Sequence, residues 1–310
     1  MAVNMKGKDL ISIHDLSTEE VWQILKTAEF LKTIQKTGEF YQPLKGKTLG
    51  MIFTKASTRT RVAFEVAIWQ LGGHGLFLNA QDLQLRRGET IADTARVLSR
   101  YLDAIMIRTF DHNDVVELAR HATIPVINGL TDLLHPTQAL ADIFTIYEKK
   151  GHLEGIKLVY VGDGNNVAHS LMFAGAKTGM QVIVATPPGY EPKAEIVELA
   201  REDAKKTGAS IELMTDPYAA VRGADVVYTD VWASMGQEAE HDRRVKDLAG
   251  YQVNARLMEA AGPGALFMHC LPAHRGEEVT DEVADGPQSV IFDEAENRLH
   301  VHKAILALVM

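Results

Sequence analysis

The sequence predicts an α/β protein with two domains, each built on a doubly wound parallel sheet. Short apolar runs of strand length, such as residues 158–161 and 182–185, alternate with longer segments that carry helix signals. This alternation is typical of parallel sheets with helices on both faces. The chain has 310 residues, and single hydrophobic cores stop growing at about 250–300 residues. Two domains are therefore expected.

The first expected element is a helix that begins at a capping box. Ser17 is placed to accept the backbone N–H of Glu20, and the Glu20 side chain is placed to reach back. Leu16 and Val21 flank this start as a hydrophobic staple. Gly38 is placed to end the helix in a left-handed conformation.

A second helix is expected over residues 58–71, after a buried strand. Val66 and Trp69 fit the face of this helix that would turn toward the core. Neither is assigned a functional role. The strands expected in this half of the chain are residues 48–53, 104–107 and 126–127.

A long helix over residues 136–150 is expected to mark the change of domain. Pro136 suits the first turn of a helix, and the strand–helix pattern starts again after Gly151. A last helix from about residue 296 is expected to return to the first domain. The domains would then be residues 1–134 with 297–310, and residues 135–296. The other elements expected in this half are strands at 158–161, 182–185, 226–229, 266–269 and 290–292, and helices at 167–178 and 191–207.

Composition and charge exclude several classes of protein. The chain has 32 Lys and Arg against 41 Asp and Glu, a net charge of −9, which is unfavourable for nucleic-acid binding through a broad basic surface. The apolar runs are too short to cross a bilayer, and the N-terminal residues lack the apolar core of a secretory signal. Cys270 is the only cysteine, which fits a reducing compartment. We predict a soluble cytoplasmic protein that binds neither nucleic acid nor membrane.

The most informative segment lies between the first strand and the second helix. Ser57 occupies the position of a helix N-cap, and the N–H groups of a helix N-terminus, with their partial positive charge, suit a phosphate. Arg59 and Arg61 add guanidinium donors that can bind phosphate oxygens in pairs. An ordinary cap with solvated arginines is the alternative. Two threonine hydroxyls and two guanidiniums within the turn that follows Ser57 favour the anion site.

The sequence Ser-Thr-Arg-Thr-Arg at residues 57–61 resembles the carbamoyl phosphate signature of the aspartate and ornithine carbamoyltransferases. Three further motifs of that family follow in order: His-Pro-Thr-Gln at 135–138, Asp-Val-Trp-Ala-Ser-Met-Gly at 230–236 and His-Cys-Leu-Pro at 269–272. The last two have the ornithine-type form. The resemblance covers nearly the whole chain. It implies a carbamoyl phosphate-binding domain first, an ornithine-binding domain second, and carbamoyl transfer to the side-chain amine of L-ornithine, giving L-citrulline and phosphate.

The resemblance also implies which residues hold carbamoyl phosphate. Arg108 would bridge the phosphate and the carbonyl oxygen, and Thr58 would help Arg108 and His135 to polarise the C=O bond. Arg298 would complete the positive charge around the tetrahedral intermediate. The implied group is Ser57, Thr58, Arg59, Thr60, Arg108, His135, Gln138 and Arg298.

A second implied group holds ornithine. Cys270 and Leu271 would lie beside the reacting amine, with the Leu271 carbonyl directed at the carbamoyl NH₂. An alkyl ammonium titrates near ~10.4, by analogy with Lys, so the site must remove a proton from the amine or select its neutral form. Cys270 and Asp230 are the candidates for this role. The implied group is Asn166, Asp230, Ser234, Met235, Cys270 and Leu271, and the implied catalytic residues are Arg108, His135, Cys270 and Arg298.

A polar loop at residues 81–89 is the expected subunit contact. In the family this loop reaches into the phosphate site of a neighbouring subunit, which implies a homo-oligomer, a trimer or a multiple of trimers. Gln84 stands where some relatives have His, and the aspartate enzymes use Ser and Lys in the loop. The contact made by Gln84 therefore stays open.

The sequence contains one segment that superficially resembles a dinucleotide-binding loop. Residues 162–166 follow a strand and open a helix, but Val167 stands where the third glycine belongs, and no acidic residue follows the next strand. No cofactor is therefore expected. The twelve histidines show no metal-binding spacing such as HExxH, so no metal site is expected either.

Two other functions remain as alternatives. The acceptor could be another amine, such as putrescine, although residues 230–236 retain the loop that grips an amino acid. A non-catalytic regulator on the same fold is the second alternative, but such a protein would be expected to have lost site residues. The sequence does not distinguish a biosynthetic from a catabolic direction.

Overall fold

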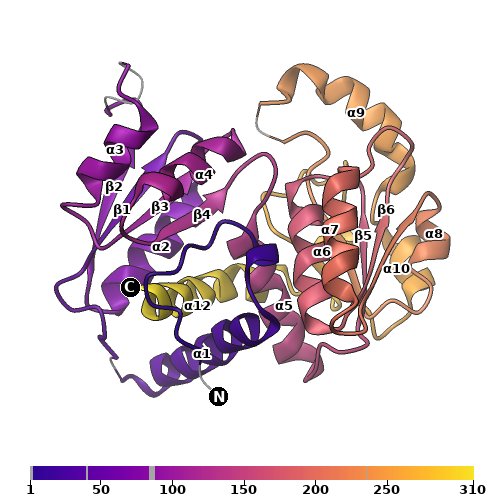
Figure 1. The fold of residues 1–310 in the computed structure, drawn as a ribbon. Helices are drawn as coiled ribbons and strands as arrows, with labels where there is room; N and C mark the ends of the chain where they lie inside the picture. The colour runs from indigo at the N-terminus through magenta and orange to yellow at the C-terminus, as the bar shows by residue number, and fades with distance from the viewer. Residues whose placement is uncertain (1–2, 40, 84–87, 235) are drawn as a thin grey trace. The chain divides into compact units, whose positions relative to one another are not determined.

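The computed structural model describes residues 3–39, 41–83, 88–234 and 236–310, and the chain forms two compact units (Figure 1). Unit 1 comprises Met1–Phe144 and Glu296–Met310, and unit 2 comprises Thr145–Ala295. The units change after Phe144, ten residues later than the predicted boundary after residue 134. Helix α5 (Pro136–Lys150) therefore begins in unit 1 and ends in unit 2. In the described part of the chain, no helix has the length and apolar character needed to cross a membrane.

Unit 1 is built on a parallel sheet of four strands in the order β2-β1-β3-β4. Because all four strands run in the same direction, their carboxyl ends meet at one edge of the sheet. The register places Phe53, the last residue of β1, beside Arg108, the last residue of β3. The strands are β1 (Thr48–Phe53), β2 (His74–Asn79), β3 (Ala104–Arg108) and β4 (Val126–Leu130).

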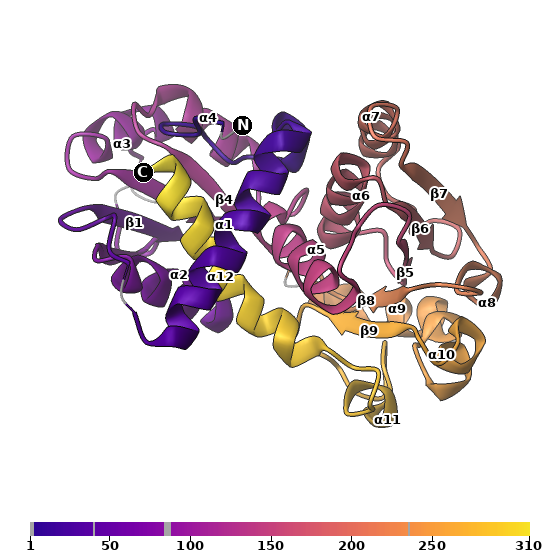
Figure 2. The same cartoon turned by 90° about the horizontal axis from the view of Figure 1, so that it is seen from below.

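Helices cover both faces of this sheet (Figures 1 and 2). Helices α3 (Ile91–Leu98) and α4 (His112–His121) pack on one face, where Ile105 lies in a buried cluster with residues of both helices. The other face carries α1 (Thr18–Thr37), α2 (Thr58–Gln70) and the part of α12 (Ile291–Val309) that belongs to unit 1. The predicted return of the C-terminal helix to the first unit is confirmed.

The capping box predicted for α1 is present. The Ser17 hydroxyl accepts the Glu20 N–H at 3.1 Å, and the Glu20 carboxylate accepts the Ser17 N–H at 2.7 Å. Gly38 ends the helix with φ 78°, a left-handed conformation that glycine adopts without a steric penalty.

One prediction for α2 was wrong. Trp69 is 66 % exposed and Val66 is only partly buried, so neither lies in the core. The buried face is formed by Thr60, Phe64, and the neighbouring Ala67 and Ile68. Helical periodicity alone does not distinguish a core face from an apolar face that is left open on a single chain.

Unit 2 has a parallel sheet of five strands in the order β7-β6-β5-β8-β9. Helices α6 (Asn166–Thr178) and α7 (Ala194–Ala204) cover one face, and α8 (Pro217–Ala220) and α10 (Ala255–Ala261) cover the other (Figures 1 and 2). The predicted class, two doubly wound parallel-sheet units, is thus confirmed. The strands are β5 (Lys157–Val161), β6 (Gln181–Ala185), β7 (Ser210–Met214), β8 (Val226–Thr229) and β9 (Leu266–His269).

Several elements differ from the predictions. Residues 290–292 form no strand: Ser289 makes only an isolated bridge to Phe267, and α12 begins at Ile291. Strand β2 was missed because it lies at the sheet edge and has no regular burial pattern. Helix α9 (His241–Leu248) was missed because it is strongly polar. The remaining short elements are α11 (Asp281–Ala284) and 3-10 helices at Ile13–Asp15, Glu238–Glu240 and Ala249–Tyr251.

Candidate functional site

In unit 1 the predicted site residues gather where the parallel strands end. The segment after β1 leads to Ser57, β3 ends at Arg108, and the segment after β4 leads to His135. The carboxyl edge of a parallel sheet is the usual place for a ligand in open α/β folds. The fold thus brings together residues from 57 to 135, up to 78 positions apart. Helix α12 adds Arg298 to this group.

The N-terminus of α2 is built as an anion-binding end. The Ser57 hydroxyl caps the helix by accepting the Thr60 N–H at 3.3 Å. No acidic residue occupies the first turn, so no side-chain carboxylate there offsets the partial positive charge of the helix end. Thr58 is exposed and Arg59 is partly buried, so both side chains remain accessible.

The buried Thr60 hydroxyl is the point on which two guanidinium groups converge. It accepts a hydrogen bond from Nη2 of Arg298 at 2.7 Å, and Nη1 of Arg108 lies at 3.5 Å. The two arginines come from α12 and β3, and are only 3 % and 6 % exposed. Their placement concentrates positive charge beside the helix N-terminus, in surroundings from which water is largely excluded.

The buried His135 is held neutral by its surroundings. Burial, followed by the positive charges of Arg298 and Arg108, lowers the pKa of His135 well below its ordinary value. A neutral imidazole still carries one N–H donor, so it can donate a hydrogen bond without adding charge. The side chain of Gln138, one turn along α5, is oriented by donating from Nε2 to the Asp142 carboxylate at 2.8 Å.

Lys55 is a buried cation that the sequence analysis did not single out. Its ammonium group pairs with Asp132 at 2.9 Å and lies 4.8 Å from the centre of the Phe110 ring. Its positive charge also contributes to the lowered pKa of His135. Lys55 stands two residues before Ser57, and its sequence position alone does not distinguish it from a surface lysine. Its burial does, since a lysine is rarely buried.

In unit 2 the other group of predicted residues lies at the carboxyl ends of β5, β8 and β9. Asn165 caps α6 by accepting the N–H groups of Val167 and Ala168 at 2.9 and 3.2 Å. The Asn165 amide also donates to the Asp230 carboxylate at 2.8 Å. Asn165 was not predicted as a site residue, although it precedes the predicted Asn166. It links the loop after β5 to the end of β8.

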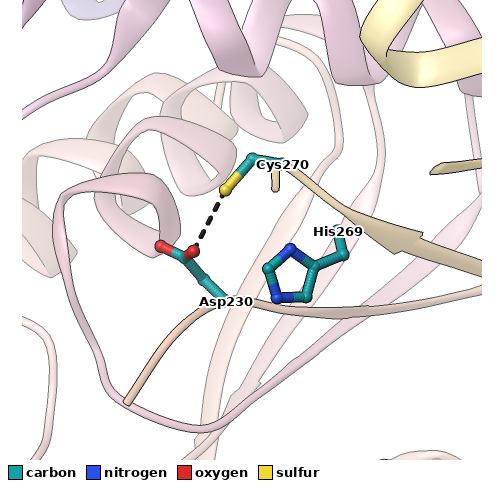
Figure 3. Close-up of side chains that lie close together, drawn as sticks. All are labelled: Asp230, His269 and Cys270. Atoms are coloured by element: carbon teal, nitrogen blue, oxygen red, sulfur yellow. Dashed lines mark hydrogen bonds between the residues drawn. The ribbon is translucent and has the colours of Figure 1, made fainter. Parts of the chain in front are cut away.

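Asp230 and Cys270 are in direct contact (Figure 3). The Cys270 thiol donates to Oδ1 of Asp230 at 3.1 Å, and the Asp230 carboxylate also accepts the Val231 N–H. His269 lies within 4.8 Å of both side chains. Its Nδ1 accepts the Leu271 N–H at 2.9 Å and its Nε2 lies 3.2 Å from the Glu278 carboxylate, so both ring nitrogens already have protein partners.

Leu271 has an unusual backbone conformation. Its φ is 58°, the left-handed region, and it precedes a cis peptide bond to Pro272. A non-glycine residue in this region costs about 1–3 kcal/mol and persists only where the surrounding structure imposes it. The hydrogen bond from its N–H to His269 is part of that restraint. The direction of the Leu271 carbonyl is therefore set by the fold.

The segment that contains Ser234 is held by an arginine that was not predicted. Nη1 of Arg244, on α9, donates to the Trp232 carbonyl at 3.1 Å and to the Asp163 carboxylate at 2.9 Å. Burial raises the pKa of Asp163 to about 6, against the lowering influence of Arg244. Ser234 is further tied to Gln237, whose side chain accepts the Ser234 N–H at 3.0 Å.

The predicted site residues thus form one group in each unit. Gln84 and Met235 lie outside the described residues. Unit 1 contains Ser57, Thr58, Arg59, Thr60, Arg108, His135, Gln138 and Arg298, and unit 2 contains Asn166, Asp230, Ser234, Cys270 and Leu271.

Two family models match the chain, one over each half. Residues 8–148 match the carbamoyl-P binding domain of aspartate/ornithine carbamoyltransferase. Residues 154–309 match the Asp/Orn binding domain of the same family.

Named relatives are similar over the full length. The ornithine carbamoyltransferase of Pyrococcus abyssi is 63 % identical over 310 residues, covering 100 % of this chain and 98 % of the relative. The solved structure of the Pyrococcus furiosus ornithine carbamoyltransferase has a TM-score of 0.97 at 63 % identity, covering 100 % and 99 % of the two chains. The anabolic ornithine carbamoyltransferase of Campylobacter jejuni has a TM-score of 0.91 at 44 % identity, covering 96 % and 97 %.

Proposed function

Because this chain belongs to the aspartate/ornithine carbamoyltransferase family, we propose that it transfers the carbamoyl group of carbamoyl phosphate to the side-chain amine of L-ornithine. The products are L-citrulline and phosphate. Full-length relatives at 63 % identity are named ornithine carbamoyltransferases, which supports ornithine as the acceptor. Nothing in these comparisons supports putrescine.

The observation that carries the proposal is the convergence of Arg108 and Arg298 on Thr60 at the N-terminus of α2. When the amine attacks the carbonyl carbon, negative charge develops on the carbonyl oxygen and on the departing phosphate. Cations and N–H donors that are already in place stabilise this charge without reorganising, which is usually the largest catalytic contribution. Ser57, Thr58 and Arg59 complete the phosphate cradle with hydroxyl and guanidinium donors.

His135 and Gln138 act on the carbamoyl group. The lowered pKa of His135 keeps the ring neutral, so it donates a hydrogen bond to the carbonyl oxygen rather than an acidic proton. Gln138 accepts from the carbamoyl NH₂ through its side-chain oxygen, since its amide nitrogen is engaged by Asp142. Together they orient the carbonyl for attack.

Asn166, Asp230 and Ser234 hold the amino-acid end of ornithine in the proposed complex, and Met235 belongs to the same loop. The Cys270 thiol donates to Asp230, so it serves as a hydrogen-bond donor and orients the carboxylate. Leu271, through its restrained backbone carbonyl, is the acceptor for the carbamoyl NH₂. Because the amine reacts only when neutral, kcat/KM for ornithine is expected to rise between pH 6 and 8.

A homo-oligomer, a trimer or a multiple of trimers, is also proposed. Exposed apolar side chains lie on α2 and on the edge strand β2, and β2 precedes the segment 81–89 of the sequence, which contains Gln84. An exposed apolar face beside a sheet edge is typical of an interaction surface. The side chains are Val62 and Trp69 of α2 and Phe77, which lies on the α2 side of β2 with its ring against Arg61.

Trp69→Glu tests the proposed assembly. The variant places a charge in the apolar face, so it is expected to sediment as a smaller species and to lose activity at low protein concentration. Glu19→Gln, an exposed change on α1, is the matched control. An unchanged sedimentation coefficient in Trp69→Glu would remove this face from the interface.

The reaction itself is tested by citrulline formation. Wild type and Arg59→Ala are assayed with carbamoyl phosphate and, in turn, ornithine, putrescine, N-acylated ornithine and aspartate. Arg120→Ala, an exposed arginine on α4, is the matched control. We expect citrulline from ornithine alone, a loss of at least ~10²-fold in Arg59→Ala, and wild-type rates in the control. Product with a different acceptor only would overturn the ornithine assignment.

The cytoplasm is the proposed compartment. Cys270 is the only cysteine of the sequence, so its thiol forms no disulfide bond within the chain. A partly buried thiol beside the reacting groups is best preserved where thiols are kept reduced.

A further inference from the structure

His241, His274 and Glu277 form a compact cluster in unit 2, apart from the residues assigned to the substrates. One ligand atom of each side chain lies within 4.8 Å of the other two. Nε2 of His241 lies 3.2 Å from Oε2 of Glu277, and Nδ1 of His274 lies 3.6 Å from the same oxygen. Two imidazoles and one carboxylate are a ligand set that recurs in zinc sites of proteins.

The local structure explains how the cluster arises. Residues 274–277 form a turn in which the Glu277 N–H donates to the His274 carbonyl at 2.9 Å. Gly276 has φ 90° at the third position of the turn, where a type II turn requires a positive φ. The turn is held by Gln252, whose amide donates to the carbonyls of Gly276 and Glu277 at 3.0 and 2.8 Å. The turn therefore presents His274 and Glu277 on one side, facing His241 at the start of α9.

The spacing of the cluster fits a tetrahedral ion. Zinc binds imidazole nitrogen and carboxylate oxygen at about 2.0–2.2 Å, so neighbouring tetrahedral ligands lie about 3.3–3.6 Å apart. The separations of His241 Nε2 and His274 Nδ1 from Glu277 Oε2, 3.2 and 3.6 Å, are close to that range. The side chains of His241, His274 and Glu277 are 38 %, 43 % and 29 % exposed, which leaves room for water to complete the coordination.

The second nitrogen of His241 has a carboxylate partner. Its Nδ1 lies 3.4 Å from Oδ1 of Asp242. A carboxylate on the far nitrogen is the usual support of a metal-binding histidine, because it fixes the ring orientation and raises the basicity of the ligand nitrogen. By contrast, both ring nitrogens of His269, in the cluster with Asp230 and Cys270, are bonded to groups outside that cluster, the Glu278 carboxylate and the Leu271 N–H.

We propose that Nε2 of His241, Nδ1 of His274 and Oε2 of Glu277 bind a divalent transition-metal ion of the zinc type. Helix α9 follows the segment that contains Ser234, and the turn at 274–277 follows Cys270 and Leu271. A bound ion therefore links the two segments that carry residues of the acceptor side. This link to the acceptor rests on the proposed function, whereas metal binding itself does not.

Zinc binding to the full-length, metal-stripped protein tests the site. Zn²⁺ is titrated calorimetrically into wild type, His241→Gln, His274→Gln and, as the matched control, His152→Gln, an exposed histidine outside the cluster. We expect each cluster variant to weaken zinc binding at least ~10-fold, and the control to match wild type. Unchanged zinc affinity in both cluster variants would overturn the proposal.

Co²⁺ separates this site from the thiol of Cys270. Bound by nitrogen and oxygen, Co²⁺ is expected to give a tetrahedral visible spectrum without a sulfur-to-metal charge-transfer band, and Cys270→Ala is expected to retain that spectrum. A charge-transfer band that disappears only in Cys270→Ala would assign the ion to the thiol and refute the proposal. These measurements need no activity, so their failure is distinct from a failure of the proposed reaction.

The link between the two segments has its own readout. Zn²⁺ is expected to slow tryptic cleavage after Arg243, on α9, in wild type but not in His274→Gln. Equal rates in wild type with and without Zn²⁺ would show that the ion does not restrain α9.

Discussion

Acid destabilisation through His302 is the prediction that the structure specifies most closely. His302, on α12, is fully buried and stacked on the Phe64 ring at 3.8 Å between ring centres. Neither of its ring nitrogens has a hydrogen-bond partner among the described residues. Burial, followed by the charge of Arg298, lowers the pKa of His302 well below the value of 6.5 expected in the unfolded chain.

The sign follows from proton linkage. Below pH 6.5 the unfolded chain binds a proton at residue 302 that the folded protein does not bind, so stability falls as the pH falls. While the buried ring stays neutral, each pH unit contributes about 1.4 kcal/mol, and at pH 5 the loss reaches about 2 kcal/mol. His302→Leu removes the titrating group and leaves no buried polar atom unsatisfied.

The assay is urea unfolding at pH 7.5 and pH 5 at one protein concentration, because an oligomer's stability depends on concentration. Wild type is expected to lose about 2 kcal/mol more than His302→Leu between the two pH values. Both proteins keep His135, so its contribution to the pH dependence cancels when the two losses are compared. A packing change from the substitution that is independent of pH cancels as well. His152→Leu, on the surface, should behave as wild type. An equal loss in wild type and His302→Leu would refute the reasoning.

Three further predictions concern the two groups of site residues. Thr60→Val removes the hydroxyl that accepts from the guanidinium of Arg298. A hydrogen bond to a charged group is worth about 1.5–3 kcal/mol, so kcat/KM for carbamoyl phosphate should fall ~10–150-fold. A change below threefold would contradict a role of this hydroxyl in positioning the guanidinium. Asn165→Ala removes the cap of α6, worth about 0.5–2 kcal/mol, and the hydrogen bond to Asp230. The melting temperature should therefore fall, and KM for ornithine should rise. An unchanged KM would show that Asn165 does not contribute to acceptor binding. The pKa of Asp163 is raised to about 6, so its carboxylate pairs fully with Arg244 only above that pH. KM for ornithine should rise as the pH falls through 6 in wild type and change less in Asp163→Asn. Parallel pH profiles would show that the Asp163–Arg244 pair does not affect ornithine binding.

The donor side could be predicted from sequence because its determinants are consecutive. Ser57 caps the helix that its own neighbours form, and the hydroxyl and guanidinium donors of residues 57–61 lie within one or two turns. Local hydrogen bonding of this kind depends on the few residues around the cap, so the order of residue types is sufficient to identify it.

Other features of the same region could not be predicted. Trp69 has the spacing of a core residue yet is exposed, because periodicity reports an apolar face and not what covers it. Lys55 is one lysine among many in the sequence, and its burial between Asp132 and the Phe110 ring follows from the packing of separate segments.

On the acceptor side, the motifs identified the segments but not their contacts. The thiol of Cys270 donates to Asp230, which is 40 residues away, and Asn165 orients the same carboxylate across 65 residues. The prediction that the chain has no metal site rested on local histidine spacing. The proposed zinc-type site departs from it, since His241 meets Glu277 only across 36 residues.

The sequence by itself determined the class of fold, the family and the identity of the helix end at residues 57–61, because strand and helix periodicity, caps and short motifs are encoded by neighbouring residues. The tertiary structure alone decided that Arg298 reaches Thr60 across 238 residues. It also decided that His135 is buried among cations that keep it neutral. Both depend on which elements pack together and how much water they exclude. Burial and charge at a site are properties of the packed elements, and no window of the sequence contains them.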